Sequence, residues 1–310
     1  MACGKNSQVP DRPGLRWRAM TPGDLEGSVI GPIAHRVDRE RIDAFVEATG
    51  DRKERWTDHA PPGYAASLLF SVAGILLNDS RIRPYLATLI HVDQQFIYHA
   101  PFDIETEVEM TGTVERVRER SGAFFVTFTA AGIADGDLIL ESRSTFLMSD
   151  QAAAASTIDR IEPAVGDRGP NDPAAPAGPF GTGTSTSNAR SASRADLVRY
   201  AAATKDFNPL HWDHATARSA GLDGVVVHGL LMLSWLAQQA SAFASGPAPI
   251  STIKVRFRSA LAPAAAATIE AVATDAEPAS GEAKVALKLS AGGTDVVTGN
   301  ASVRLGEVTR

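Results

Sequence analysis

The sequence predicts an α+β protein built from two similar halves, each an apolar helix followed by an antiparallel sheet. Apolar stretches typical of buried helices occur once in each half, at residues 64–77 and 228–243. Segments of alternating polarity follow them, as expected for antiparallel strands with one wetted face. A sheet wrapped around a long apolar helix buries the apolar side of both, and this arrangement defines the predicted fold class.

The remaining elements repeat in the same order in both halves. In the first half, Asp38 is expected to cap a helix that precedes the apolar one, and a strand is expected at residues 104–110. In the second half, Ser193 and Asp196 have the spacing of a capping box at the start of the corresponding helix. Three strands should follow the second apolar helix, at residues 254–258, 268–274 and 284–289.

A change in composition separates the two halves. Residues 151–192 are rich in Ala, Pro, Gly, Ser and Thr and too poor in bulky apolar side chains to build a core. We therefore predict a linker at residues 151–192, between an N-terminal domain at residues 1–150 and a C-terminal domain at residues 193–310.

Composition excludes several classes of protein. The chain has 310 residues, a net charge of −6 and few aromatic side chains, so it lacks the basic surface expected of a nucleic-acid binder. Cys3 is the single cysteine, and residues 1–20 lack the apolar core of a secretory signal. The longest apolar stretches, at residues 68–77 and 225–237, are shorter than the roughly 20 residues that span a bilayer. We expect a cytoplasmic protein that binds neither nucleic acid nor membranes.

A short motif in the second half brings together three side chains suited to acid–base chemistry. Asp206, Asn208 and His211 lie within six residues, around Pro209. The proline disfavours a helical conformation at the preceding residue, so the segment should leave its helix and curl back. A carboxylate and an imidazole that reach one water are the minimum equipment for adding water to a double bond or removing it.

The first half carries the frame of this motif without its chemistry. Asp51 lies 155 positions before Asp206 and follows a similar Ala-Thr sequence. At that offset Trp56 corresponds to His211, and Lys53 corresponds to Asn208. We therefore expect one active half and one degenerate half.

These residues resemble the signature of the MaoC-like, or R-specific enoyl-CoA hydratase (hydratase 2), family. The resemblance implies a double hotdog fold, with a degenerate N-terminal hotdog and a catalytic C-terminal one. Lys205 departs from the family pattern, which usually has glycine there, and this raises the possibility of a shifted loop. The matching positions are Tyr200, Asp206, Asn208, Pro209, Leu210, His211 and Ala217, followed by Val227-His228-Gly229-Leu230-Leu231.

The resemblance implies reversible hydration of trans-2-enoyl thioesters to (3R)-hydroxyacyl thioesters. Asp206 and His211 would share one water, with the roles of acid and base left open, and the Gly229 amide at the start of a helix would stabilise the oxyanion. Asn208 would orient the loop or the water, and His228 would shape the turn or contact substrate. No cofactor is implied beyond the coenzyme A or acyl carrier protein that carries the substrate. A homodimer is compatible with the resemblance.

The degenerate half is expected to help bind the acyl chain. Asp51 and Phe96 are 45 positions apart, whereas Asp206 and Phe257 are 51 apart, so backbone missing from the first half could leave room for an acyl tail. Small residues on its apolar helix suggest the same. The acyl-pocket candidates are Gly63, Ala66 and Ala73.

Other interpretations of the same residues remain open. Taken singly, the motif residues are ordinary turn formers. A metal site is the second alternative, built from Asp206, His211, Asp213, His214 and His228. A hotdog thioesterase would use a carboxylate on the central helix, and no acidic residue occurs between positions 228 and 243. A non-catalytic acyl-thioester binder or partner subunit is the last alternative.

The other histidines and a run of arginines are not assigned to a site. His59, His91 and His99 have no partner pattern and are interpreted as surface or core residues. The arginines at 116–120 are interpreted as a solvated strand end.

Overall fold

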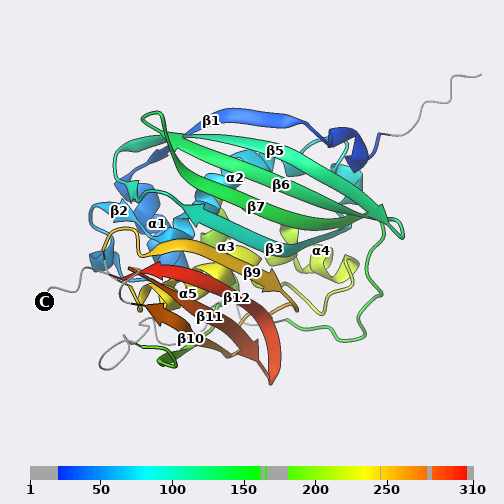
Figure 1. The fold of residues 1–310 in the computed structure, drawn as a ribbon. Helices are drawn as coiled ribbons and strands as arrows, with labels where there is room; N and C mark the ends of the chain where they lie inside the picture. The colour runs from blue at the N-terminus through cyan, green and yellow to red at the C-terminus, as the bar shows by residue number, and fades with distance from the viewer. Residues whose placement is uncertain (1–19, 162–164, 166–180, 245, 278–280, 306–310) are drawn as a thin grey trace, which may run out of the picture.

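A ten-stranded antiparallel sheet runs through both halves of the chain in the computed structural model, which describes residues 20–161, 165, 181–244, 246–277 and 281–305. Its strand order is β1-β5-β6-β7-β3-β9-β12-β11-β10-β8 (Figure 1). The first half supplies β1 (Val29–Val37), β3 (Thr88–Tyr98), β5 (Thr106–Arg120), β6 (Ala123–Ala134) and β7 (Asp137–Ser149), besides the short pair β2 (His59–Ala60) and β4 (Phe102–Asp103). The second half supplies β8 (Ser185–Arg190), β9 (Ile250–Phe257), β10 (Ala267–Glu277), β11 (Glu282–Ala291) and β12 (Thr294–Arg304).

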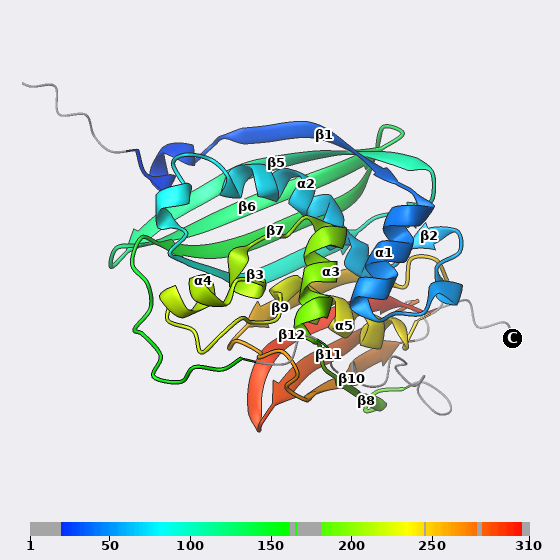
Figure 2. The same cartoon turned by 180° about the vertical axis from the view of Figure 1, so that it is seen from behind.

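The helices gather on one face of this sheet (Figure 2). They are α1 (Arg39–Thr49) and α2 (Ala65–Leu77) in the first half, and α3 (Arg194–Thr204), α4 (His214–Ser219) and α5 (Gly229–Ser241) in the second. Short 3-10 turns stand at Pro22–Leu25, Lys53–Arg55, Pro62–Tyr64, Arg83–Tyr85 and Pro209–His211. The two apolar stretches form the buried helices α2 and α5, which confirms the predicted α+β double hotdog. No helix in the described part of the chain is long and apolar enough to cross a membrane.

The two halves meet at β3 and β9, which pair antiparallel from Asp93 opposite Arg256 to Ile97 opposite Thr252. This pairing makes the sheet continuous across the two halves of the chain. Phe96 lies opposite Ile253 across this pairing. Because the pairing is antiparallel, the N-terminal end of β3 lies near Phe257, at the C-terminal end of β9.

The predicted helix starts are confirmed. The Asp38 carboxylate accepts the Arg41 amide at 2.9 Å, and Ser193 and Asp196 form a reciprocal capping box. Lys205 ends α3 with φ 66°, in the same left-handed conformation as Gly50 at the end of α1, where φ is 62°. The lysine therefore keeps the turn that glycine makes in the other half, at the cost of local backbone strain.

The predicted linker at residues 151–192 ends too late. Ser185–Arg190 forms β8, an edge strand that pairs with β10 from Val272 opposite Ser185 to Ala267 opposite Arg190. Small polar residues suit an edge strand, because the ladder hydrogen bonds of the backbone, and not the side chains, hold it. The middle of the linker and the N-terminal segment with Cys3 lie outside the described residues.

The spacing from Asp51 to Phe96 is shorter than that from Asp206 to Phe257. This difference arises outside the central helices, since α2 and α5 each span 13 residues. In the second half α4 stands between the Asp206 motif and α5. The corresponding stretch of the first half holds the 3-10 turns Lys53–Arg55 and Pro62–Tyr64 and no counterpart of α4.

Candidate active site

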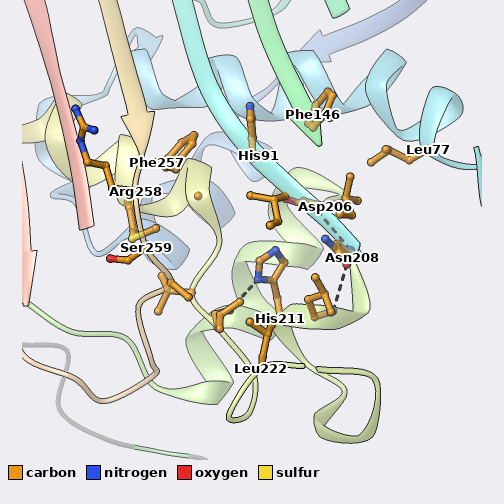
Figure 3. Close-up of a pocket in the computed structure, with 18 of the residues that line it drawn as sticks. Leu77, His91, Phe146, Asp206, Asn208, His211, Leu222, Phe257, Arg258 and Ser259 are labelled. Carbon is orange, nitrogen blue, oxygen red and sulfur yellow. Dashed lines mark hydrogen bonds between the residues drawn. The ribbon is translucent and has the colours of Figure 1, made fainter. Parts of the chain in front are cut away.

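A cavity of about 310 Å³ opens beside the Asp206 motif, and both halves of the chain line it (Figure 3). The second half contributes Asp206, Asn208, His211 and Gly229, together with the end of β9 and the residues after it. The volume lies at the lower end of the range for small-molecule sites. From the first half come Phe70, Leu77, Leu89, Ile90, His91 and Phe146.

The proline-bent loop buries Asp206, which is 7% exposed. After Lys205 the chain turns at Asn208, whose side chain accepts the Leu210 amide at 3.2 Å and so caps the 3-10 turn Pro209–His211. The Asn208 amide in turn donates to Asp206 Oδ1 at 3.4 Å. Burial raises the pKa of Asp206 to about 7, partly opposed by that amide.

His211 is held in one tautomer. Its Nδ1 lies 2.7 Å from the Val226 carbonyl oxygen, which can only accept, so Nδ1 carries the proton and Nε2 keeps its lone pair. Burial lowers the pKa of His211 to about 4, and the Val226 carbonyl acts in the opposite direction. The ring is therefore neutral at pH 7 and able to accept a proton at Nε2.

Asp206, His211 and His228 each bring a polar side-chain atom within 4.8 Å of the others. Two hydrogen bonds of ordinary length span up to about 5.6 Å, so one water can contact both Asp206 and His211. The loop thus brings together the pair that the sequence predicted.

His228 packs against both members of this pair. Its ring stacks on His211 with a centroid distance of 3.8 Å, and its Nε2 lies 3.3 Å from the Asp206 backbone carbonyl. Its Nδ1 is buried and has no hydrogen-bond partner among the described residues. Burial and the neighbouring His211 hold the pKa of His228 well below its usual range, so this histidine is a neutral packing element at pH 7.

Gly229 is the first residue of α5, and it lines the cavity. Amides in the first turn of a helix have no partner within the helix and carry the positive end of its dipole. A Cβ at this position would lie 3.2 Å from two carbons of the Phe257 ring, so a larger residue would press on that ring. The first turn of α5 therefore lies at the cavity wall, with an amide that its own helix leaves unpaired.

The same residues fit a metal ion poorly. The rings of His211 and His228 are stacked with an interplanar angle of 26°, so the lone pairs of their nitrogens lie in nearly parallel planes. A tetrahedral metal ion needs nitrogen donors that converge on one point at about 2.0–2.1 Å. The other two candidates are engaged elsewhere. His214 Nε2 lies 2.8 Å from Asp159, and Asp213 caps α4.

The corresponding position in the first half is filled. Trp56 Nε1 donates to Asp51 Oδ2 at 2.9 Å, and the space beside them holds only about 10 Å³. Burial raises the pKa of Asp51, against the opposing effects of its hydrogen bonds and of Arg55. An indole in place of the imidazole leaves no room for substrate.

The acyl-pocket candidates need correction. Gly63, Ala66 and Ala73 do not line the cavity; the two alanines are fully buried, and a Cβ on Gly63 would meet Ser234 of α5 at 2.8 Å. At Gly63 the small residue allows this close approach to α5. The first half does line the cavity, through larger side chains that include Phe70 and His91. His91 was expected to be an ordinary surface or core histidine, whereas His99 does lie at the surface, beside Glu141.

Comparisons with known proteins identify relatives for each half. The MaoC-like domain family model matches residues 176–292, and the model of the FAS1-like dehydratase domain region matches residues 24–141. A UPF0336 protein of Streptomyces coelicolor is 30% identical over 115 residues, 32% of this chain and 77% of that protein. A mitochondrial 3-hydroxyacyl-[acyl-carrier-protein] dehydratase of Arabidopsis thaliana is 39% identical over 64 residues, 21% of this chain and 38% of that protein.

Solved structures share the whole fold. A MaoC-like dehydratase superimposes with a TM-score of 0.75 at 20% identity, covering 91% of this chain and 98% of its own. Rv0216 of Mycobacterium tuberculosis, described as a double hotdog, has a TM-score of 0.64 at 13% identity and covers 93% of this chain and 99% of its own. At these identities the likeness establishes the fold alone.

Proposed function

This chain belongs to the MaoC-like dehydratase family, and we propose that it catalyses the reversible hydration of trans-2-enoyl thioesters to (3R)-hydroxyacyl thioesters. The observation that carries this proposal is the approach of Asp206 and His211 to within 4.8 Å at an apolar cavity. The amide end of α5 beside them supplies the third requirement of the reaction, a donor for the thioester oxygen.

The protonation states support a division of roles. His211, neutral with a free Nε2, takes the proton from water as its oxygen attacks C3 of the enoyl group. Asp206, protonated up to about pH 7, delivers a proton to C2. In the dehydration direction the same two groups act in reverse.

Negative charge develops on the thioester oxygen between these two steps. The Gly229 amide at the helix terminus is our candidate donor to that oxygen. A single donor of this kind contributes roughly 3 to 4 kcal/mol of transition-state stabilisation in other enzymes. Asn208 keeps the loop closed by capping its turn, and His228 holds the His211 ring by stacking.

Two rival functions remain as outcomes of the test. A thioesterase of this fold would use a carboxylate on the central helix, and α5 (Gly229–Ser241) carries no acidic residue. In a non-catalytic binder, Lys205 would mark a disabled loop, but its left-handed backbone matches that of Gly50. The carrier is coenzyme A or acyl carrier protein in this proposal, without a further cofactor.

The test follows two signals with crotonyl-CoA and longer enoyl thioesters: loss of enoyl absorbance and release of free thiol. Hydration predicts enoyl loss without thiol, abolished by Asp206→Asn and by His211→Ala. Asp51→Asn, the matched change in the filled half, should leave the rate unchanged. Thiol release would establish the thioesterase, and binding without either signal would establish the binder. Chiral analysis of the product tests the 3R assignment.

The division of roles makes a separate prediction about pH. Because Asp206 must be protonated and His211 neutral, kcat/KM should be level between about pH 4 and 7 and should fall above pH 7. A rate that rises through pH 7 would instead make the Asp206 carboxylate the base. The measurement is the pH profile of kcat/KM with one enoyl thioester.

A further inference from the structure

The first residues of the linker pack against the loop that joins α4 to α5. The Arg160 amide donates to the Asp223 carbonyl oxygen at 2.9 Å. A Cβ on Gly221 would lie 2.7 Å from a backbone carbonyl oxygen of the linker, so a larger residue would not fit where the two segments touch. Residues 153–160 belong to the predicted linker, yet they form a strap across the loop at residues 220–227.

Arg218, in the last turn of α4, fastens this strap to the loop. Its guanidinium donates to two carbonyl oxygens of the strap, that of Ser156 at 2.9 Å and that of Ile158. It also donates to two carbonyl oxygens of the loop, that of Leu222 at 3.1 Å and that of Asp223 at 3.4 Å. Because arginine carries five donors on one planar group, a single side chain can hold backbone carbonyls of both segments at once.

The same loop forms one side of the candidate active site. Leu222, Val226 and Val227 line the cavity, and Figure 3 shows Leu222 on the same side of the cavity as His211. The Val226 carbonyl oxygen accepts the proton on His211 Nδ1, at 2.7 Å, which fixes the tautomer that leaves Nε2 free. The Val226 amide donates to the Leu210 carbonyl oxygen at 3.1 Å, which holds the far end of the loop. The strap and Arg218 hold the near end.

We propose that Arg218 is a positioning residue for His211: by tying the strap to the loop, it holds Leu222 and the Val226 carbonyl against the imidazole. The inference rests on the proposed enoyl-thioester function, in which His211 presents Nε2 to the catalytic water. Arg218 is not one of the residues that line the cavity, so it acts through the loop and not on the substrate. Without the guanidinium, the carbonyls that it binds lose their partner, and the loop should move to expose them to water.

The test compares Arg218→Ala with Arg304→Ala, a matched control. The Arg304 guanidinium also links distant segments through backbone carbonyls, but none of these lines the cavity. They are the carbonyls of Ala248, Ile250 and Tyr98, at 2.7–2.9 Å. Both changes therefore remove an arginine that joins two segments, and only the change at Arg218 affects the loop of the active site.

The first measurement is the proton–nitrogen NMR spectrum of the histidine rings in the free protein, with His211→Ala to assign the His211 signals. In wild type and in Arg304→Ala, His211 should show a single tautomer protonated at Nδ1. In Arg218→Ala, the ratio of this tautomer to the other should fall about fivefold, the effect of losing one hydrogen bond.

The second measurement is the hydration of crotonyl-CoA at a temperature well below the Tm of every variant. In Arg218→Ala, kcat should fall by about the same factor of five while KM changes less, because the tautomer matters for proton transfer and not for binding. Arg218→Lys keeps the charge and three donors, so it should recover part of the loss. Arg304→Ala should keep the wild-type kcat.

Two results would overturn the inference. One is a single Nδ1-protonated tautomer in Arg218→Ala. The other is an equal loss of kcat in Arg218→Ala and Arg304→Ala, which would make the role of Arg218 one of general stability. If Arg218→Ala does not fold, Arg218→Lys serves in the same comparison, with a smaller change of the same kind expected.

The NMR measurement also separates this inference from the proposed reaction, because it needs no turnover. A tautomer shift in Arg218→Ala of a protein that hydrates no enoyl thioester would refute the proposed reaction alone. Hydration by a protein whose His211 tautomer does not depend on Arg218 would refute this inference alone.

Discussion

Replacing Asp206 with asparagine should abolish hydration and yet stabilise the protein at neutral and alkaline pH. Asp206 is 7% exposed, and burial raises the pKa of its carboxyl from 3.8 to about 7. An acid with a higher pKa in the folded state binds more protons there than in the unfolded state, so the free energy of unfolding falls as pH rises from about 4 to 7. A shift of about three units corresponds to a loss on the order of 4 kcal/mol. Asparagine cannot ionise, and it keeps the oxygen that accepts the Asn208 amide.

Thermal unfolding of both proteins between pH 4 and 8 measures this effect. The difference in Tm should be near zero at pH 4 and should grow with pH in favour of Asp206→Asn, to about 5 °C or more at pH 8. His211 and His228, whose pKa values are lowered by burial, make both proteins less stable as the pH falls below about 6.5, and this common contribution cancels in the difference. A difference that stayed flat across the range would mean that Asp206 is already ionised at neutral pH, and the role of Asp206 as acid would be lost.

Three further substitutions test other parts of the site. Gly229→Ala keeps the backbone amide but brings a Cβ to 3.2 Å from Phe257, so kcat should fall about tenfold as the donor is misaligned, with Tm nearly unchanged. An unaltered kcat would contradict the claim that a side chain at position 229 disturbs the helix terminus. Lys205→Gly relieves a left-handed backbone at φ 66° and should raise stability by about 1 kcal/mol with activity kept; a lower Tm would contradict the strain argument. Trp56→Ala should cost about 3–5 kcal/mol of stability while the folded fraction still hydrates crotonyl-CoA. Loss of turnover in that folded fraction would mean that the first-half site contributes to catalysis.

Local chemistry explains why much of the site could be predicted from the sequence. Helix caps at Asp38 and Ser193 and the turn at Pro209 depend on residues only a few positions away. For the same reason the closeness of Asp206 and His211 could be predicted before any fold was known. The Lys205 departure was also visible, but its consequence was not, because whether a lysine accepts a left-handed backbone depends on how firmly the rest of the loop is held.

The wall of the cavity, in contrast, depends on contacts between residues far apart in the chain. His91 faces the cavity because β3 slips by one residue against β7, and a register shift leaves no mark in the sequence of one strand. Gly63, Ala66 and Ala73 were plausible pocket residues by size alone, but Gly63 packs against Ser234 of α5, and the two alanines are fully buried away from the cavity.

The sequence by itself thus predicted the α+β fold class and the closeness of Asp206 and His211, because both follow from short-range backbone preferences and the periodicity of apolar side chains. The tertiary structure alone decided the pKa directions of Asp206 and His211, the first-half wall and the position of His91. These depend on burial and on strand register, which arise when the two halves pack around one cavity.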